Sequence, residues 1–201
     1  EEGGSCAAVF TQNAFCAAPV TVARQHLAQE PRWLLCNSGN ANAGTGPRGM
    51  SDALSSCEAA AEVLGGDLHQ VLPYSTGVIG EPLPLAKLVA ALPAAAANLD
   101  EQHWDHAARA IMTTDTFPKG ASERFEIAGE TVVITGISKG AGMIQPNMAT
   151  MLGFIATDAK ISQDLLQSCL SQAVEQSFNR ITVDGDTSTN DACTILASGA
   201  S

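Results

Sequence analysis

The sequence has few aromatic residues, few basic residues and no long hydrophobic run. Aromatic residues make up only 4% of its 201 residues, and no apolar run approaches the ~18 residues that a membrane-spanning helix needs. Lysine and arginine number 10 against 21 aspartates and glutamates, so the formal net charge at pH 7 is -11. A charge of this sign repels the phosphate backbone of nucleic acids. We therefore expect a soluble, cytoplasmic protein that binds neither nucleic acid nor membrane.

The sequence also lacks the cysteine spacings that are typical of disulfide frameworks and metal sites. Its six cysteines contain no C-x-x-C pair and stand in apolar or helical patterns, which favours reduced, packed thiols. A long apolar chain of this kind has little need of disulfides. His103 and His106 lie three residues apart in a predicted helix, but no cysteine or acidic pair accompanies them, so we predict no metal site.

Strand and helix patterns mix along the whole chain. Runs of apolar and β-branched residues predict strands, with two in residues 6–24, others at 32–36, 71–74, 151–156 and 181–184, and a hairpin at 124–135. Helical patterns cover residues 52–64, with Ser51 as the N-cap, and residues 83–92, 99–111 and 164–178. Turn-forming residues dominate positions 37–46 and 75–77. The mixture predicts an α/β fold with a mixed sheet, in one structural unit.

The most unusual stretch is KGAGMIQPNMATMLGFIATD at residues 139–158. Its glycines permit close backbone approach, Pro146 fixes a bend, and Thr150 then opens a hydrophobic strand. In a constrained turn the Thr150 hydroxyl could attack the carbonyl of Ala149 and release an N-terminal threonine. The free α-amine, with a reference pKa of about 7.7 to 8.0, could then accept the proton of its own hydroxyl. From the residues alone, an ordinary strand-opening threonine is the favoured alternative.

This stretch and several others resemble the ornithine acetyltransferase family, which is bifunctional with N-acetylglutamate synthase. The segments that carry the resemblance follow in the family's order and are FTQN at 10–13, CAAPV at 16–20, NSGNANAGTG at 37–46, STGVIG at 75–80, TTDTFPK at 113–119, residues 139–158 and DGDTSTND at 184–191. The resemblance implies mixed sheets packed with helices in layers, a fold like that of DmpA and the ornithine acetyltransferases. It also implies an α-chain portion at 1–149 and the start of a β-chain portion at 150–201.

The resemblance implies an enzyme of arginine biosynthesis that cleaves itself between Ala149 and Thr150. Thr150 then takes the acetyl group of N-acetylornithine and passes it to glutamate, with ping-pong kinetics. No cofactor is implied, and whether acetyl-CoA is also a donor stays open. The expected assembly is a heterotetramer of α and β chains.

The resemblance also carries over individual site residues. Thr76 and Gly77 match the family's oxyanion-hole pair, and Thr116 and Lys139 match substrate-binding positions alongside Thr150. Lys139 offers the one cation of the nucleophile stretch for an anionic carboxylate. The family's remaining substrate contacts, a glutamate and, near its C-terminus, an asparagine and a threonine, have no match in this sequence. Because family members are much longer, we expect a truncated chain.

Two other readings stay open beside acetyl transfer. Gly44-Thr45-Gly46-Pro47-Arg48-Gly49 fits the G-x-G-x-x-G string of a Rossmann-like nucleotide-binding enzyme, although turn residues separate it from the predicted strand and Pro47 lacks an N–H. The other alternative is an uncleaved fragment without activity.

Residues 184–191 alternate acidic and hydroxyl side chains like a calcium loop. However, Ile195 stands where the loop needs glutamate, so we predict structural hydrogen bonding there.

Overall fold

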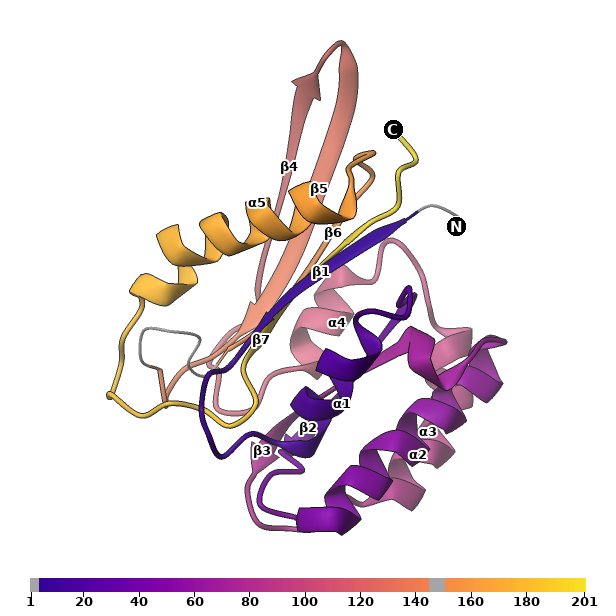
Figure 1. The fold of residues 1–201 in the computed structure, drawn as a ribbon, viewed down its shortest axis with the longest axis vertical. Helices are drawn as coiled ribbons and strands as arrows, with labels where there is room; N and C mark the ends of the chain where they lie inside the picture. The colour runs from indigo at the N-terminus through magenta and orange to yellow at the C-terminus, as the bar shows by residue number, and fades with distance from the viewer. Residues whose placement is uncertain (1–3, 145–150) are drawn as a thin grey trace.

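The computed structural model describes residues 4–144 and 151–201, and its strands form two sheets (Figure 1). The larger sheet is five-stranded and mixed, in the order β1-β7-β6-β5-β4, and the smaller is a parallel pair of β2 and β3. The strand bounds are β1 Ser5–Phe10, β2 Trp33–Asn40, β3 Val71–Val78, β4 Lys119–Ile127, β5 Glu130–Lys139, β6 Leu152–Thr157 and β7 Ala192–Ala197.

Helices cover both sheets and complete a layered arrangement. Their bounds are α1 Ala18–His26, α2 Gly46–Leu64, α3 Leu85–Ala97, α4 Trp104–Ala110 and α5 Gln163–Gln176, with short 3-10 turns at Leu68–Gln70 and Phe178–Arg180. Helix α5 lies across one face of the larger sheet, while α1, α4 and the smaller sheet lie on its other face (Figure 1). Helices α2 and α3 form the outermost layer beyond α1 and β3.

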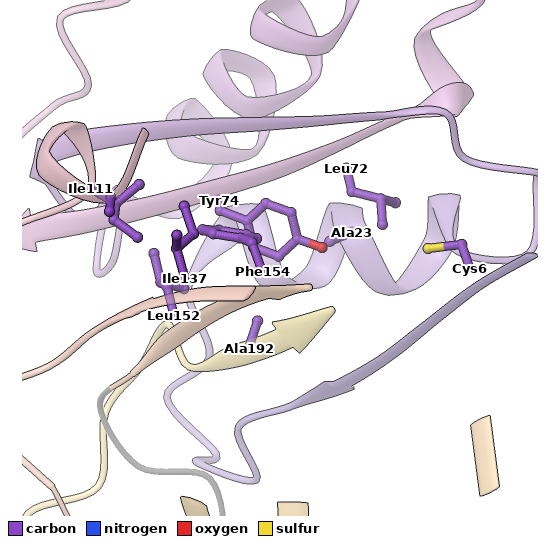
Figure 2. Packing of buried hydrophobic residues seen from close by; sticks show 10 residues of the cluster. Cys6, Ala23, Leu72, Tyr74, Ile111, Ile137, Leu152, Phe154 and Ala192 are labelled. Carbon is purple, nitrogen blue, oxygen red and sulfur yellow. The ribbon is translucent and has the colours of Figure 1, made fainter. Parts of the chain in front are cut away.

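The core between the two sheets is centred on Tyr74 of β3 (Figure 2). Its ring meets the ring of Phe154 of β6 edge-on, with the ring centroids 5.0 Å apart, a favoured aromatic geometry. Its hydroxyl forms a 2.6 Å hydrogen bond with the hydroxyl of the fully buried Thr194 of β7. This pair of contacts fixes β3 against the larger sheet just before Ser75, Thr76 and Gly77.

The strand registers bring distant segments of the chain together at one end of the larger sheet. Antiparallel pairing sets Lys139, the last residue of β5, opposite Leu152, the first residue of β6. Parallel pairing sets Leu152 beside Ala192, the first residue of β7. The end of β5 and the beginnings of β6 and β7 therefore lie side by side.

The predicted α/β class with a mixed sheet is confirmed. The hairpin is present as β4 and β5, longer than predicted, with its turn at Ala128 and Gly129. The helix predicted at 52–64 is α2, which ends at Gly65 in the left-handed conformation, as its sequence indicates. It begins six residues earlier, at Gly46, so Ser51 lies inside the helix and is not its N-cap.

Several predicted boundaries were wrong. The second strand expected within residues 6–24 is helix α1, which begins at Ala18 with Pro19 in its first turn, where proline's fixed φ suits a helix. Residues 181–184 form no strand, and β7 was not predicted. The turn-rich segments at 37–46 and 75–77 contain strand residues, because β2 runs to Asn40 and β3 to Val78. In each case tertiary packing overrode a local propensity.

We predict that Tyr74→Phe lowers the free energy of unfolding by about 1–3 kcal/mol, because it leaves the buried Thr194 hydroxyl without its partner. Urea unfolding should show a lower midpoint with an unchanged m-value. The double variant Tyr74→Phe with Thr194→Val, which removes both hydroxyls, should recover part of the loss. Equal midpoints for Tyr74→Phe and the wild type would refute this role of the bond.

Candidate active site

Thr76 and Gly77 lie at the end of β3, where the backbone of β2 passes very close. Gly77 pairs with Gly39 of β2 and has a φ of 135°. A Cβ atom built at Gly77 would lie 2.2 Å from the carbonyl carbon of Gly39 and 2.5 Å from the backbone nitrogen of Asn40. Only glycine fits such a position, so the close approach of the two strands fixes the residue type beside Thr76.

Lys139 is buried and directs its ammonium group at Thr76. The residue is only 5% exposed, and its Nζ donates a 2.8 Å hydrogen bond to Thr76 Oγ1. No carboxylate in residues 4–144 and 151–201 forms an ion pair with it. Burial lowers the pKa of Lys139, while the charges of Asp115 and Asp191 act to raise it. The structure therefore brings together two of the residues that the sequence predicts for the site.

Thr116 is exposed and lies in the segment before β4. Its neighbour Asp115 accepts a 2.8 Å hydrogen bond from the N–H of Gly140 and forms a 2.5 Å ion pair with Lys119. Burial acts to raise the pKa of Asp115, but the Lys119 ammonium and the N–H groups of Gly140 and Thr113 hold it below its ordinary value. Asp115 thus ties the segment that carries Thr116 to the residue that follows Lys139.

Asn190 connects the beginning of β7 to the end of β3, which carries the predicted oxyanion pair. Its Nδ2 donates to the carbonyl of Ser75 at 2.9 Å and to the carbonyl of Ala41 at 2.7 Å. The hydroxyl of Ser75 in turn donates to Asn37 Oδ1 of β2 at 2.6 Å. The ends of β2 and β3 are therefore held in a fixed position relative to the larger sheet. The run at 184–191 stands out in the sequence, but this role of Asn190 was not predicted from it.

Asp191 is a buried carboxylate beside the beginning of β6. It is 2% exposed, and no donor in the described part of the chain forms a hydrogen bond with its Oδ2. Burial raises the pKa of Asp191 to about 7, against the opposing effects of the Ser188 hydroxyl, the Met151 N–H and the Lys139 charge. Asp191 was not predicted from the sequence, where its place in the DGDTSTND run is the one local signal that draws attention to it.

Ala149 and Thr150, the predicted cleavage pair, lie outside the described residues. The description resumes at Met151, which directly follows Thr150 in the sequence, and Leu152 begins β6 opposite Lys139. The described residues that adjoin Met151 and Leu152 in the sheet are Lys139, which pairs with Leu152, and Asp191, which directly precedes Ala192, the strand partner of Leu152.

The acidic run at 184–191 forms structural hydrogen bonds, as predicted. The carboxylate of Asp184 accepts hydrogen bonds from the N–H groups of Met143, Ile144 and Asp186.

His103 and His106 stack with their ring centroids 4.5 Å apart. Within residues 4–144 and 151–201, no three His, Cys, Asp or Glu side chains are arranged to hold a metal ion. In the same ranges, no helix has the length and apolar character to cross a membrane.

The glycine-rich loop of the nucleotide-binding alternative does connect a strand to a helix, since β2 ends at Asn40 and α2 begins at Gly46. However, the side chain of Asn42 fills the interior of this loop. Asn42 is 1% exposed, donates to the carbonyl of Gly49 at 2.9 Å and accepts from the Thr45 hydroxyl at 2.8 Å. In this structure the polar side chains of the loop therefore bond to other groups of the same loop and helix start.

A surface hollow of about 1010 Å³ lies between the ends of β1, α1 and β7. Arg24, Arg32, Trp33 and Ser198 are among the residues that line it. Neither Thr76 nor Lys139 lines it, so the hollow is separate from the residues predicted for the site.

Comparison with known proteins identifies the family. A sequence model described as the ArgJ family matches residues 1–201. The chain belongs to the ArgJ family. This confirms the resemblance from which the site residues were predicted.

Curated relatives are similar over nearly the whole chain. The arginine biosynthesis bifunctional protein ArgJ of Methylococcus capsulatus (strain Bath) is 70% identical over 197 residues, which are 98% of this chain and 48% of that protein. The protein of the same name from Pseudomonas fluorescens (strain Pf0-1) is 59% identical over 198 residues, 98% of this chain and 49% of that protein. The chain therefore spans about half the length of the curated relatives it matches.

Solved structures share the fold. The crystal structure of arginine biosynthesis bifunctional protein ArgJ from Bacillus halodurans has a TM-score of 0.63 and 32% identity, covering 74% of this chain and 92% of that chain. The ornithine acetyltransferase of Mycobacterium tuberculosis, solved in complex with ornithine, has a TM-score of 0.58 and 28% identity, covering 75% of this chain and 93% of that chain. These likenesses confirm the predicted ornithine-acetyltransferase-like fold.

We predict that Gly77→Ala destabilises the protein by at least about 3 kcal/mol, because the added methyl group would overlap the backbone of Gly39 and Asn40. The matched control is Gly80→Ala, where φ is 86° but no atom lies within 4 Å of the added carbon. That variant should lose only about 1–2 kcal/mol, the cost of a left-handed alanine. Thermal unfolding of both variants measures the difference, and equal losses would contradict the close approach of β2 and β3.

Proposed function

We propose that this chain is part of an acetyltransferase that moves the acetyl group of N-acetylornithine to glutamate through an acetyl-Thr150 intermediate. The observation that carries the proposal is the buried pair of Lys139 and Thr76 beside the beginning of β6, in a chain of the ArgJ family. A relative's name, ornithine acetyltransferase, and its bound ornithine support the substrate class.

The first step is the maturation of the chain. The Thr150 hydroxyl attacks the carbonyl carbon of Ala149, the peptide bond breaks as the acyl group moves to oxygen, and water hydrolyses the ester. The products are an α part at 1–149 that ends in a carboxylate and a β part that begins with the free amine of Thr150. That amine is the general base, because its reference pKa of about 7.7 to 8.0 lets it accept the hydroxyl proton near neutral pH.

In acetyl transfer, the Thr150 oxygen attacks the acetyl carbonyl of N-acetylornithine and the carbonyl oxygen becomes negative. The Thr76 hydroxyl and the Gly77 N–H are the proposed donors to this oxygen. The C–N bond then breaks, the released amine of ornithine takes the proton, and Thr150 carries the acetyl group as an ester. Attack by the glutamate amine reverses these events and releases N-acetylglutamate.

The hydrogen bond from Lys139 supports this role of Thr76. A threonine hydroxyl has one hydrogen to donate and lone pairs that accept. Lys139 Nζ donates to a lone pair of Thr76 Oγ1, so the hydrogen of this hydroxyl points in another direction. Among the described residues, no acceptor takes that hydrogen in a hydrogen bond, so it is available to an oxyanion.

Lys139 and Thr116 are the proposed substrate contacts on this chain. The Lys139 ammonium can attract an α-carboxylate as a point charge, and Asp115 holds the segment of Thr116 next to Gly140. The bifunctional names of the relatives favour acetyl-CoA as a second acetyl donor for glutamate. A heterotetramer of α and β chains is the proposed assembly, and no cofactor is required by this chemistry.

We predict that the protein, expressed at the length of its relatives, separates into two polypeptides, the second beginning with Thr150. Thr150→Ala should give a single chain and lose acetyl transfer at least ~1000-fold, since the nucleophile and its amine are both lost. Mass spectrometry and a transfer assay from N-acetylornithine to glutamate measure these effects.

The matched control for this prediction is Thr131→Ala, which removes an exposed hydroxyl of β5 that donates a hydrogen bond to the Glu126 carboxylate. It should leave both cleavage and transfer unchanged. An intact wild-type chain that transfers acetyl groups at full rate would overturn the Thr150 mechanism. An intact chain without transfer would favour the inactive alternative, and transfer that requires a nicotinamide cofactor would favour the nucleotide-binding one.

A further inference from the structure

Asp191 is a buried carboxylate that the proposed mechanism does not use. Its Oδ2 is buried without a hydrogen-bond partner among residues 4–144 and 151–201, and such an atom ordinarily costs a protein stability. Buried, unsatisfied polar atoms are rare in native structures and call for a physical reason. The position of Asp191 in the sheet suggests that reason.

The strand register places Asp191 next to the site. Leu152 and Ala192 are paired in the parallel ladder of β6 and β7, and the N–H of Ala192 donates to the carbonyl of Met151 at 3.1 Å. Asp191, one residue before Ala192, therefore lies beside Met151, where the Met151 N–H contributes to its pKa. Lys139 pairs with Leu152 on the other side of β6, so Asp191 and Lys139 flank the beginning of that strand.

Lys139 has no ion-pair partner in the described part of the chain. The charges that counteract the effect of burial on its pKa therefore act from a longer range. The charged and titratable groups that act on it are Asp115 and Lys119 from the segment at the start of β4, Asp191 before β7, and Cys36 of β2. A buried ammonium without a nearby negative charge readily loses its proton.

Asp115 and Asp191 differ in how far their charges are already compensated. Asp115 is in direct contact with the Lys119 ammonium at 2.5 Å and accepts the N–H of Gly140. No lysine or arginine of the described residues forms an ion pair with Asp191. Asp191 is thus the carboxylate whose charge remains uncompensated near Lys139.

We propose that Asp191 is a positioning residue of the acetyl-transfer site, whose buried negative charge keeps Lys139 protonated and so maintains the hydrogen bond that orients the Thr76 hydroxyl. The predicted effect of Asp191 on acetyl transfer rests on the proposed function. The charge coupling between Asp191 and Lys139 is a property of the folded chain and can be measured separately.

The direction of the effect follows from the charges. Without the Asp191 charge, the pKa of Lys139 falls further, because burial already lowers it and one of the groups that raise it is gone. The ammonium is then lost at a lower pH, and with it the donor to Thr76 Oγ1. The alkaline limb of the pH profile of transfer should move to lower pH.

The test is Asp191→Asn, which keeps the shape of the side chain and removes its charge, in the protein expressed at the length of its relatives. NMR titration of the Lys139 side chain, assigned by its absence in Lys139→Arg, should show a pKa lower by about one unit. The alkaline limb of the pH profile of kcat/KM for N-acetylornithine should move to lower pH by a similar amount. Above that limb, kcat/KM should therefore be about ten-fold lower than in the wild type. Asp191→Glu, which keeps the charge, should restore the limb.

Asp105→Asn is the matched control, because it makes the same chemical change in an exposed ion pair with Arg109 on α4. It should change neither the titration nor the profile. If Asp191→Asn does not fold, the wild-type Lys139 titration should itself show a second inflection at about pH 7, where Asp191 takes up its proton.

The possible failures are distinguishable. An unchanged Lys139 pKa in Asp191→Asn, or the absence of the second inflection where that variant does not fold, overturns the proposal. A lowered Lys139 pKa with an unmoved pH profile overturns the positioning role, while the proposed function stands. A wild-type protein that transfers no acetyl group overturns the proposed function, and the positioning role with it. The NMR titration then still decides whether Asp191 controls the charge of Lys139.

Discussion

The hydrogen bond between the buried ammonium of Lys139 and the hydroxyl of Thr76 is the interaction on which the rest of the site depends. Removing an ammonium group from water costs several kcal/mol unless its donors are satisfied and opposite charge lies near. The bond therefore exists only because the surrounding fold holds both ends rigidly. Lys139 ends β5, Thr76 lies near the end of β3, and these strands belong to different sheets.

Two sets of hydrogen bonds between the sheets lie close to this bond in the sequence of β3. The Tyr74 hydroxyl reaches Thr194, and Asn190 donates to the carbonyls of Ser75 and Ala41. Together they fix β3 on either side of the peptide that joins Tyr74 to Ser75, just before Thr76. Because every group is buried and hydrogen-bonded, the Thr76 hydroxyl is oriented before any substrate arrives. Such preorganisation is the property that makes a donor effective at a developing negative charge.

The sequence predicted the fold class and the family from motifs, while contacts between distant segments could be found only in the structure. The β4 and β5 hairpin and the end of α2 at Gly65 follow from local signals. The helix α1 was missed because its β-branched residues Val20 and Val22 favour strands locally, yet both are buried where α1 packs on its neighbours.

The same distinction holds for the candidate site. Thr76, Gly77 and Lys139 were predicted because they lie in motifs that resemble the family, but their mutual distance could not be read from the sequence. Asn190 and Asp191 were not predicted as site residues, because their roles depend on the parallel register of β6 and β7 and on burial. A carboxylate in a polar run of the sequence gives no sign that it will be only 2% exposed, next to the beginning of a buried strand.

The most direct test of the central claim is to trap the acetyl-enzyme by adding N-acetylornithine without an acceptor and to map the acetyl group by peptide mass spectrometry. The account predicts acetylation of the peptide that begins with Thr150, and loss of that acetyl group when glutamate is added. Acetylation at another residue, or none while transfer proceeds, would contradict it.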